Sequence, residues 1–359
     1  MAHKHIRHIM LLLGVAAVMI AVTATSGYSA SAAPSKLTDV TFALAVNPPD
    51  QGQTFAYVPK GAGYFAKNGL NVAFQPNTGG GAALKQLAAG NAQFAISSPE
   101  NLLNGLAAGE DLRGVATILT HSIYSVGVLK NSKIKSVSQL RGKNVGVSSL
   151  TSGSFPTAQA ALAEKGIDYK SDAKIVVVGN GGPAVNALLT HQIDAMVTTD
   201  TQFAIFKVLG AGIRFLPKPA VTKLPGDLIL VQTSYLQAHP DIVAKFSRAV
   251  MEGTVYALAN PNKAIGFYLQ QYPEVGNLYT RTHNKQIMMA RLKNMTLIKQ
   301  QHKKWGYIPV SLYQKVQSED LQLGTITKSA DLKTVLTNQL SKQIDKFNVK
   351  KIQKQAKGK

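Results

Sequence analysis

The stretch NVAFQPNTGGGAALKQLAAGNAQFAIS, residues 71–97, predicts a strand, a helix and a second strand in succession. Two runs rich in valine, phenylalanine and isoleucine, at 71–74 and 92–97, are typical of β-strands. Between them, leucine and alanine recur at helical spacing over residues 81–89. A helix between two strands predicts an α/β fold in which neighbouring strands run parallel.

The same alternation continues on both sides of this stretch. Further strand-like runs occupy residues 40–46, 113–119, 125–130, 144–149, 174–178, 194–199, 213–216 and 228–232. Helix-length segments lie between them at 53–68, 99–108, 156–165, 183–191 and 201–209. After residue 232 the pattern predicts only helices, such as 240–259 and 262–271. Pro59 is expected to kink or shorten the first helix, because proline lacks the backbone N–H that a helix interior uses.

The N-terminus has the pattern of a cleaved signal peptide over residues 1–32. Two basic residues, Lys4 and Arg7, precede an apolar run at 9–24, and small residues follow up to Ala32. The apolar run has about 16 residues, fewer than the roughly 20 that span a bilayer. The chain contains no cysteine, so it has no thiol for a lipid anchor, a disulfide or a thiolate metal site. We therefore expect a protein exported to the periplasm and not integral to the membrane.

The order of the elements predicts two lobes. About 327 residues follow the leader, more than one hydrophobic core usually holds. We predict a first lobe of residues 33–123 and 227–359, discontinuous and with a helical C-terminal part. A second lobe of residues 124–226 is inserted into it. Each lobe is expected to be a mostly parallel sheet flanked by helices, and the two chain crossings, near 121–125 and 225–229, are expected to form a hinge.

The chain is strongly basic, with 39 Lys and Arg against 18 Asp and Glu. Without the leader the net charge is about +19. Nucleic-acid proteins gather such charge on one face or arm, whereas these bases are spread thinly apart from the tail after Ser341, so nucleic-acid binding is not expected. Two explanations stay open: attraction of an anionic solute, and life in an acidic medium, where extra lysine costs little solubility.

Polar and small residues follow successive strands. In open α/β sheets the carboxyl ends of strands and the adjoining helix N-termini form the ligand site. The candidate ligand-binding residues of the first lobe are Asn47, Gln53, Thr54, Gly79, Gly80, Gly81, Ser97 and Ser98. Those of the second lobe are Tyr124, Thr151, Ser152, Gly153, Ser154, Asn180, Thr199 and Asp200. Ordinary helix capping and turn formation also use these residue types, so each single assignment has that alternative.

Residues 151–154 are the strongest candidates for holding the head group of the solute. Pro156 favours a helix start, so Ser154 or a neighbour is placed to cap that helix while the loop donates N–H and O–H groups outward. We expect Ser154→Glu to weaken binding of an anionic solute roughly tenfold or more without touching the core.

One motif favours a different function. Residues 179–184 match the dinucleotide pattern G-x-G-x-x-A, and Asp200 follows about 20 residues later. An exported oxidoreductase that uses a nucleotide cofactor is therefore the alternative. The motif lies in the middle of the chain, however, and its helix allows only about two turns. No H-E-x-x-H, G-x-S-x-G or P-loop motif is present, so we expect no catalytic residue, no cofactor and no metal.

Five segments together resemble a known family of transport proteins. They are GYFAKNGLNV at 63–72, LAAGNAQFA at 87–95, VSQLRGKNVGV at 137–147, ALLTHQIDA at 187–195 and KWGY at 304–307. These segments resemble importer-binding proteins for sulfonates, nitrate and thiamine-precursor pyrimidines, the NitT/TauT or SsuA/THI5-like group. The resemblance implies the type II, two-lobed periplasmic binding protein fold and a small polar or anionic solute bound in its cleft. We expect the protein to be a monomer. It also implies docking on the permease of an ABC importer and its ATPase.

Two departures from the family pattern bear on the solute and on activity. Many sulfonate-binding relatives have Trp-Asp-Pro where this chain has Thr199, Asp200 and Thr201, so the resemblance leaves the solute open. Yeast-type pyrimidine synthases share the fold and are enzymes, but the resemblance attaches their chemistry to a cysteine cluster that this chain lacks. Binding without turnover is therefore expected.

Overall fold

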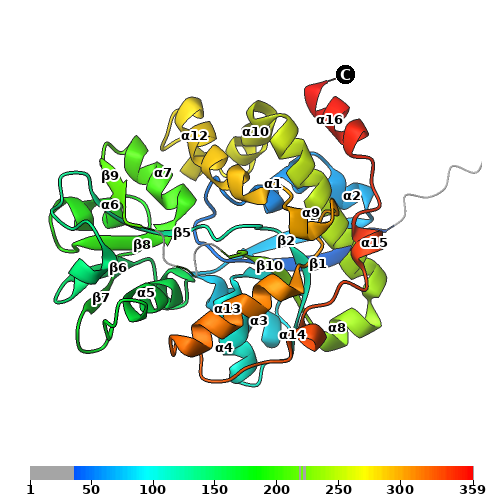
Figure 1. Ribbon diagram of the computed structural model, residues 1–359. Helices are drawn as coiled ribbons and strands as arrows, with labels where there is room; N and C mark the ends of the chain where they lie inside the picture. Colours follow the sequence, from blue (N-terminus) through cyan, green and yellow to red (C-terminus); the bar gives the residue numbers. More distant parts are fainter. Residues whose placement is uncertain (1–35, 218–219, 221–223, 359) are drawn as a thin grey trace, which may run out of the picture. The chain divides into compact units, whose positions relative to one another are not determined.

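The computed structural model describes residues 36–217, 220 and 224–358 (Figure 1). The predicted signal peptide lies outside the described residues. Two five-stranded sheets form within them, each flanked by helices. Every strand predicted from the sequence is present, so the α/β expectation is confirmed.

The first sheet has the strand order β2-β1-β3-β10-β4. β1 pairs parallel with β2 and β3, whereas β10 runs antiparallel to β3 and β4. Four strands therefore share one direction and only β10 opposes them, as a mostly parallel sheet requires. The strands are β1 (Thr38–Leu44), β2 (Leu70–Pro76), β3 (Phe94–Ser97), β4 (Leu112–Thr117) and β10 (Leu228–Gln232).

The second sheet repeats this plan with the order β7-β6-β8-β5-β9. Here β6 pairs parallel with β7 and β8, and β5 is the reversed strand, antiparallel to β8 and β9. Its strands are β5 (Tyr124–Leu129), β6 (Asn144–Val147), β7 (Lys174–Val177), β8 (Ala195–Thr199) and β9 (Ile213–Phe215). All five come from one continuous stretch of chain, shown in green in Figure 1.

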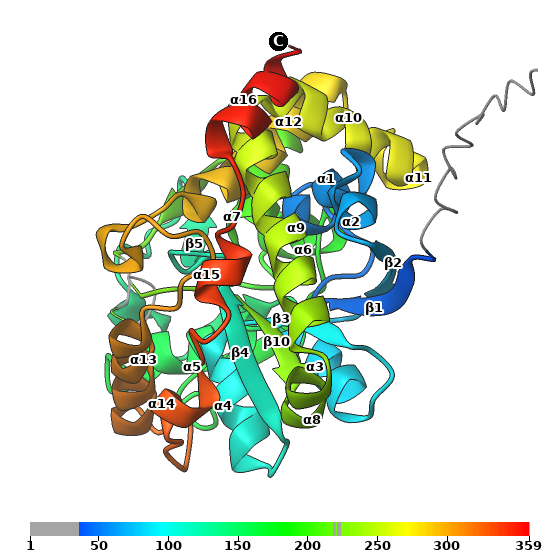
Figure 2. The same cartoon turned by 90° about the vertical axis from the view of Figure 1, so that its right-hand side faces the viewer.

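Alternation of side chains along the strands gives each sheet two apolar faces. In the first sheet, Phe42 packs on one face and Ala43 on the other. The long helix α9 (Pro240–Ala259) runs along the Phe42 face (Figure 2), where the ring of its Phe246 stacks on Phe94 at 3.7 Å between centroids. Helices α3 (Gly80–Ala88), α4 (Pro99–Ala107) and α13 (Val310–Gln322) cover the opposite face.

The remaining helices follow the predicted pattern with one difference. The segment predicted as one helix over 53–68 is two, α1 (Thr54–Gly61) and α2 (Tyr64–Lys67), because Gly63 between them takes a left-handed conformation with φ of 77°. The second sheet is flanked by α5 (Ser154–Ala163), α6 (Gly182–Leu189) and α7 (Asp200–Val208). The C-terminal part adds, among others, α8 (Thr233–Ala238), α10 (Pro261–Gln271), α12 (Arg281–Leu292) and α16 (Val349–Lys357).

The chain passes between the two sheets twice, after β4 and before β10. The two passing segments lie side by side: the N–H groups of Ile118 and Leu119 donate to the carbonyl of Asp227 at 3.0 and 3.1 Å. The N–H of Gly226 donates in turn to the carbonyl of Leu119 at 2.9 Å. This pairing holds Asp227 at the junction of the two sheets.

Candidate functional site

A small polar cavity lies where loops at the ends of strands from both sheets converge. Its volume is about 40 Å³, room for roughly three water molecules. The segments around the first sheet contribute Asp50, Gln53, Asp227 and Arg291 to its lining. The segments around the second sheet contribute Tyr124, Ser148, Ser152, Asn180, Thr199 and Gln202.

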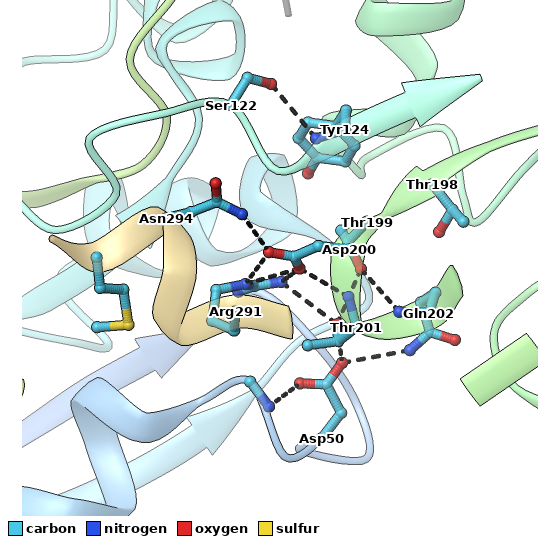
Figure 3. A network of polar contacts seen from close by, with 12 residues as sticks. Asp50, Ser122, Tyr124, Thr198, Thr199, Asp200, Thr201, Gln202, Arg291 and Asn294 are labelled. Atoms are coloured by element: carbon cyan, nitrogen blue, oxygen red, sulfur yellow. Dashed lines mark hydrogen bonds and ion pairs between the residues drawn. The ribbon is translucent and has the colours of Figure 1, made fainter. Parts of the chain in front are cut away.

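Among the described residues, Arg291, from α12, brings the only cationic side chain to this lining. Its side chain is 3% exposed, and its Nη2 lies 2.8 Å from Oδ1 of Asp200 at the start of α7 (Figure 3). The Nε of Arg291 also donates to Asp200 at 2.9 Å, and Asn294 Nδ2 donates to the second oxygen of Asp200 at 2.7 Å. The guanidinium is therefore already paired with a carboxylate of the chain itself.

Asp50, in the loop after β1, makes a second link to α7. Its Oδ2 accepts hydrogen bonds from Thr201 Oγ1 at 2.9 Å and from Gln202 Nε2 at 3.3 Å (Figure 3). Its Oδ1 accepts the N–H of Gly52 at 2.9 Å, which fixes the loop. Through Asp50 and Arg291, the first residues of α7 are joined to segments that belong with the first sheet.

Two buried acceptors of the cavity have no hydrogen-bond partner among the described residues. They are Oδ1 of Asp227 and Oε1 of Gln53. Burial raises the pKa of Asp227 to about 7, with Arg291 lowering it and Glu100 and Asp200 raising it. Because an unpaired buried acceptor is unfavourable, these two atoms are the groups of the cavity that most need a hydrogen-bond donor.

The structure brings part of the predicted site together. The predicted residues that line the cavity are Gln53, Tyr124, Ser152, Asn180 and Thr199. Tyr124 is buried, and its ring covers Gly153 so closely that any side chain at position 153 would overlap the tyrosine. Glycine is needed there for space, and the ligand-binding role expected of Gly153 stays a prediction.

The predicted glycines 79–81 lie against the loop that carries Thr151. The N–H of Gly81 donates to the carbonyl of Thr151 at 2.9 Å, and a Cβ at Gly79 would overlap the backbone at Thr151. A Cβ at Gly80 would likewise overlap the hydroxyl of Ser97. Residues 79–81 and Thr151 thus face one another in direct backbone contact, but outside the lining itself.

The expectation for Ser154 is corrected by its burial. Ser154 is 0% exposed, its Oγ accepts the N–H of Ser148 at 3.1 Å, and the same hydroxyl donates to Ser152 Oγ at 3.1 Å. It is the first residue of α5, and the cap position belongs to Gly153, which makes no side-chain cap. A glutamate at 154 would therefore intrude into packed protein, so the predicted Ser154→Glu test would not leave the core untouched.

The remaining predicted residues lie outside the lining. Asn47 is exposed, Thr54 is buried with its hydroxyl 3.2 Å from the sulfur of Met295, and Ser97 and Ser98 are buried near the start of α4. Asp200 stands behind the wall, paired with Arg291. Both of its carboxylate oxygens accept hydrogen bonds from the chain itself, from Arg291 and Asn294.

Sequence reasoning missed Asp50, Gln202, Asp227 and Arg291. Arg291 comes from a C-terminal helix, and no rule about strand ends could have placed it there. Asp227 carried a weak signal, since it is a single acid directly before the apolar run of β10. Among the described residues no group of three or more His, Cys, Asp or Glu is placed to hold a metal. No helix within those residues has the length and apolar character to cross a membrane.

A family model described as NMT1/THI5 like matches residues 51–264, more than half of the chain. The chain belongs to the NMT1/THI5-like family. The riboflavin-binding protein RibY of Chloroflexus aurantiacus is 24% identical over 84% of this NMT1/THI5-like chain and 86% of its own length. The formylaminopyrimidine-binding protein of Halalkalibacterium halodurans is 24% identical over 63% of this chain and 68% of its own.

Among solved structures, the alkanesulfonate-binding protein SsuA from Xanthomonas axonopodis pv. citri, bound to MOPS, is similar with a TM-score of 0.66. The match covers 84% of this NMT1/THI5-like chain and 99% of SsuA, at 14% sequence identity. This likeness, with the two five-stranded sheets, shows the two-lobed α/β fold of periplasmic binding proteins. The expected fold class and family are thereby confirmed.

Proposed function

We propose that this protein is the substrate-binding component of an ABC importer, which captures a small solute in the cavity at Asp50, Asp227 and Arg291 and delivers it to the permease and its ATPase. The observation that supports this most is the cavity itself, lined by polar groups of both sheets and carrying two unpartnered acceptors. The two lobes are residues 33–123 with 227–359, and residues 124–226. The protein acts in the periplasm as a monomer, after removal of its signal peptide, and binds without turnover.

We propose an amino-substituted nitrogen heterocycle of the pyrimidine class as the solute. Two carboxylates, Asp50 and Asp227, line the cavity, and Asp200 stands behind its wall. The one guanidinium that the described residues bring to the lining, that of Arg291, is already paired with Asp200. A sulfonate or nitrate would meet this surplus of negative charge, whereas N–H groups would satisfy the free acceptors. Two relatives are named for binding nitrogen heterocycles, riboflavin and formylaminopyrimidine. Riboflavin is too large for a cavity of this size, and a single pyrimidine ring also requires the walls to move.

Calorimetric titration of the purified protein tests this assignment. We expect 4-amino-5-hydroxymethyl-2-methylpyrimidine to bind with a micromolar or lower Kd, and MOPS to bind at least a hundredfold more weakly, a difference of about 2.7 kcal/mol. The physical reason is that the aminopyrimidine supplies donors to free acceptors, while the sulfonate brings a second anion to Asp227. Equal or tighter binding of MOPS would contradict the solute class, and tight binding of NAD would favour the oxidoreductase alternative.

Closure of the lobes around the solute gives a second test. Gly79 adopts extended backbone and lies against Thr151, so Gly79→Phe should place a wedge between the two loops while leaving both hydrophobic cores intact. We expect aminopyrimidine affinity to fall at least tenfold, or by about 1.4 kcal/mol. In small-angle scattering, saturating aminopyrimidine should shrink the radius of gyration of the parent but not of Gly79→Phe.

Gly212→Phe is the matched control, since position 212 is exposed and a Cβ there would meet only the side chain of Lys130 at ordinary contact distance. It should bind and contract like the parent. A parent radius that stays the same at saturation would count against closure.

A further inference from the structure

Asp227 occupies an unusual position for a carboxylate. It precedes β10 directly, and its own carbonyl accepts two N–H groups from the neighbouring crossing segment, so its backbone cannot move independently of the junction. The residue is 6% exposed, and it lines the cavity. Its side chain is therefore held by rigid structure, yet it is directed at a site rather than into an apolar core.

One oxygen of this carboxylate has no hydrogen-bond partner in the described part of the chain. Oδ1 of Asp227 is buried without a hydrogen-bond partner. The charged groups that act on it are Arg291 from α12, Glu100 from α4 and Asp200 from α7. Arg291 is the only cation of the three, and its guanidinium is taken up by Asp200 at 2.8 Å. The two other groups are acids, which make the ionised form of Asp227 less favourable still.

Two buried tyrosines near Asp227 do not donate a hydrogen bond to its Oδ1. Burial raises the pKa of Tyr124, from β5, and of Tyr313, from α13, and the negative charge of Asp227 raises both further. The hydroxyl of Tyr313 is committed elsewhere, donating to the carbonyl of Gly226 at 3.2 Å and lying 3.2 Å from Thr117 Oγ1. Burying a carboxylate with this little support reduces the stability of the empty protein, and such local conflicts concentrate at functional sites.

We propose that Asp227 is the specificity-determining residue of the cavity, accepting a hydrogen bond from an amino group of the solute, with Gln53 as a second acceptor. This inference rests on the proposed function, because it names the group that recognises the solute proposed for this cavity. An amino group that donates to a carboxylate makes a charge-assisted bond, and a ligand without it leaves the carboxylate buried and unpaired. The residue thus both attracts amino-substituted rings and rejects their unsubstituted analogues.

A matched pair of ligands and two variants test the assignment. The ligands are 4-amino-5-hydroxymethyl-2-methylpyrimidine and the same ring with hydrogen in place of the amino group. We expect the parent to prefer the amino compound by roughly tenfold to a hundredfold. Asp227→Leu, which removes the acceptor at similar size, should bind the two ligands equally. Asp227→Asn keeps one oxygen but not the charge, so its preference for the amino compound should be weaker than that of the parent and stronger than that of Asp227→Leu.

The ratio of the two affinities separates recognition from a structural role. If Asp227 only maintained the junction, Asp227→Leu would weaken both ligands by the same factor and keep the preference, and that result would overturn the proposal. Asp39→Asn, an exposed acid on β1, serves as the control and should leave the ratio unchanged. Asp227→Asn should also melt no lower than the parent at pH 8, because it removes a buried charge; this shows that any loss of binding does not come from unfolding.

The same titrations distinguish failure of the inference from failure of the proposed function. A parent that binds neither pyrimidine contradicts the aminopyrimidine assignment, and the role of Asp227 falls with it. A parent that binds both rings equally, or a variant that keeps the preference, leaves solute binding intact and refutes only the role of Asp227.

Discussion

Arg291→Met is expected to lower the free energy of unfolding by about 3 to 5 kcal/mol, the usual effect of removing one partner from a buried ion pair. Arg291 is almost fully buried, and its guanidinium bonds to both the carboxylate of Asp200 and the hydroxyl of Thr201. Methionine fills similar volume but leaves Asp200, whose side chain is only 14% exposed, without a cation, and Asp50 loses a nearby positive charge. Urea denaturation at pH 7, followed by circular dichroism, measures the difference.

Two further variants make this prediction specific. Arg281→Met changes an exposed arginine at the other end of α12, whose guanidinium donates to the carbonyl of Asn262, and should change stability by no more than about 0.5 kcal/mol. Adding Asp200→Asn to Arg291→Met should recover part of the loss, since it removes the charge that was left unpaired. Equal destabilisation by Arg281→Met and Arg291→Met would show that the buried pair has no special role.

Stability is expected to rise as the pH falls from 8 to 5. Burial raises the pKa of Asp227 to about 7. Burial and the neighbouring Glu100 raise the pKa of Asp320, in α13, to about 8, and burial also raises the pKa of Glu100. These carboxyls take up protons in the folded state at pH values where they are ionised in the unfolded chain, so folding is favoured by acid in this window. For Asp227 alone the effect between pH 8 and pH 5 is on the order of 2 to 3 kcal/mol, since only about two pKa units of its shift lie in this window.

Other acids, which lie near the surface, set the lowest pH at which acid still stabilises the fold. Hydrogen bonds lower the pKa of Asp172, Asp241 and Asp331, so they stabilise the fold when ionised and lose that contribution only in stronger acid. Calorimetric melting at pH 5, 6.5 and 8 and constant ionic strength checks the trend. Asp320→Asn should flatten the dependence by raising stability mainly at pH 8. A melting temperature that is higher at pH 8 than at pH 5 would refute this account.

The charge of the cavity bears on the basic composition of the chain. The sequence left two explanations for the surplus of lysine and arginine, an anionic solute or an acidic medium. Of the basic side chains within residues 36–217, 220 and 224–358, only Arg291 reaches the cavity lining, and it is neutralised there by Asp200. The structure therefore gives no support to the first explanation. The second stays a prediction, and the expected stability in acid is consistent with it.

The strands could be predicted from the sequence because their signal is local. β-branched and aromatic runs separated by helical spacing mark each strand without reference to distant residues, and the run at 228–232 is as clear as the others. The division of the first helix was missed, because the left-handed conformation of Gly63 depends on how the next strand is approached.

The residues that line the cavity were harder to predict from the sequence than the strands. Loops after strands were correctly expected to converge, and Gln53 and Asn180, which are far apart in the sequence, do line one cavity. Ser154 looked like a helix cap, but its hydroxyl serves the turn after β6 instead. Arg291 lies about 90 residues from its partner Asp200, and only packing of α12 against α7 joins them. Such long-range pairs leave no periodic pattern in a single sequence.

The position of β10 also determines the order in which the sheets can be completed. β3 and β4 are adjacent in the chain but not in the sheet, since β10 lies between them and is synthesised about 110 residues after β4. All strands of the second sheet lie within that interval, so this sheet can close first through shorter loops. Until β10 arrives, β3 and β4 each have an unpaired edge that another chain could join. The segment around Asp227 therefore takes part in two events, the proposed recognition of the solute in the finished protein and completion of the first sheet in the new one.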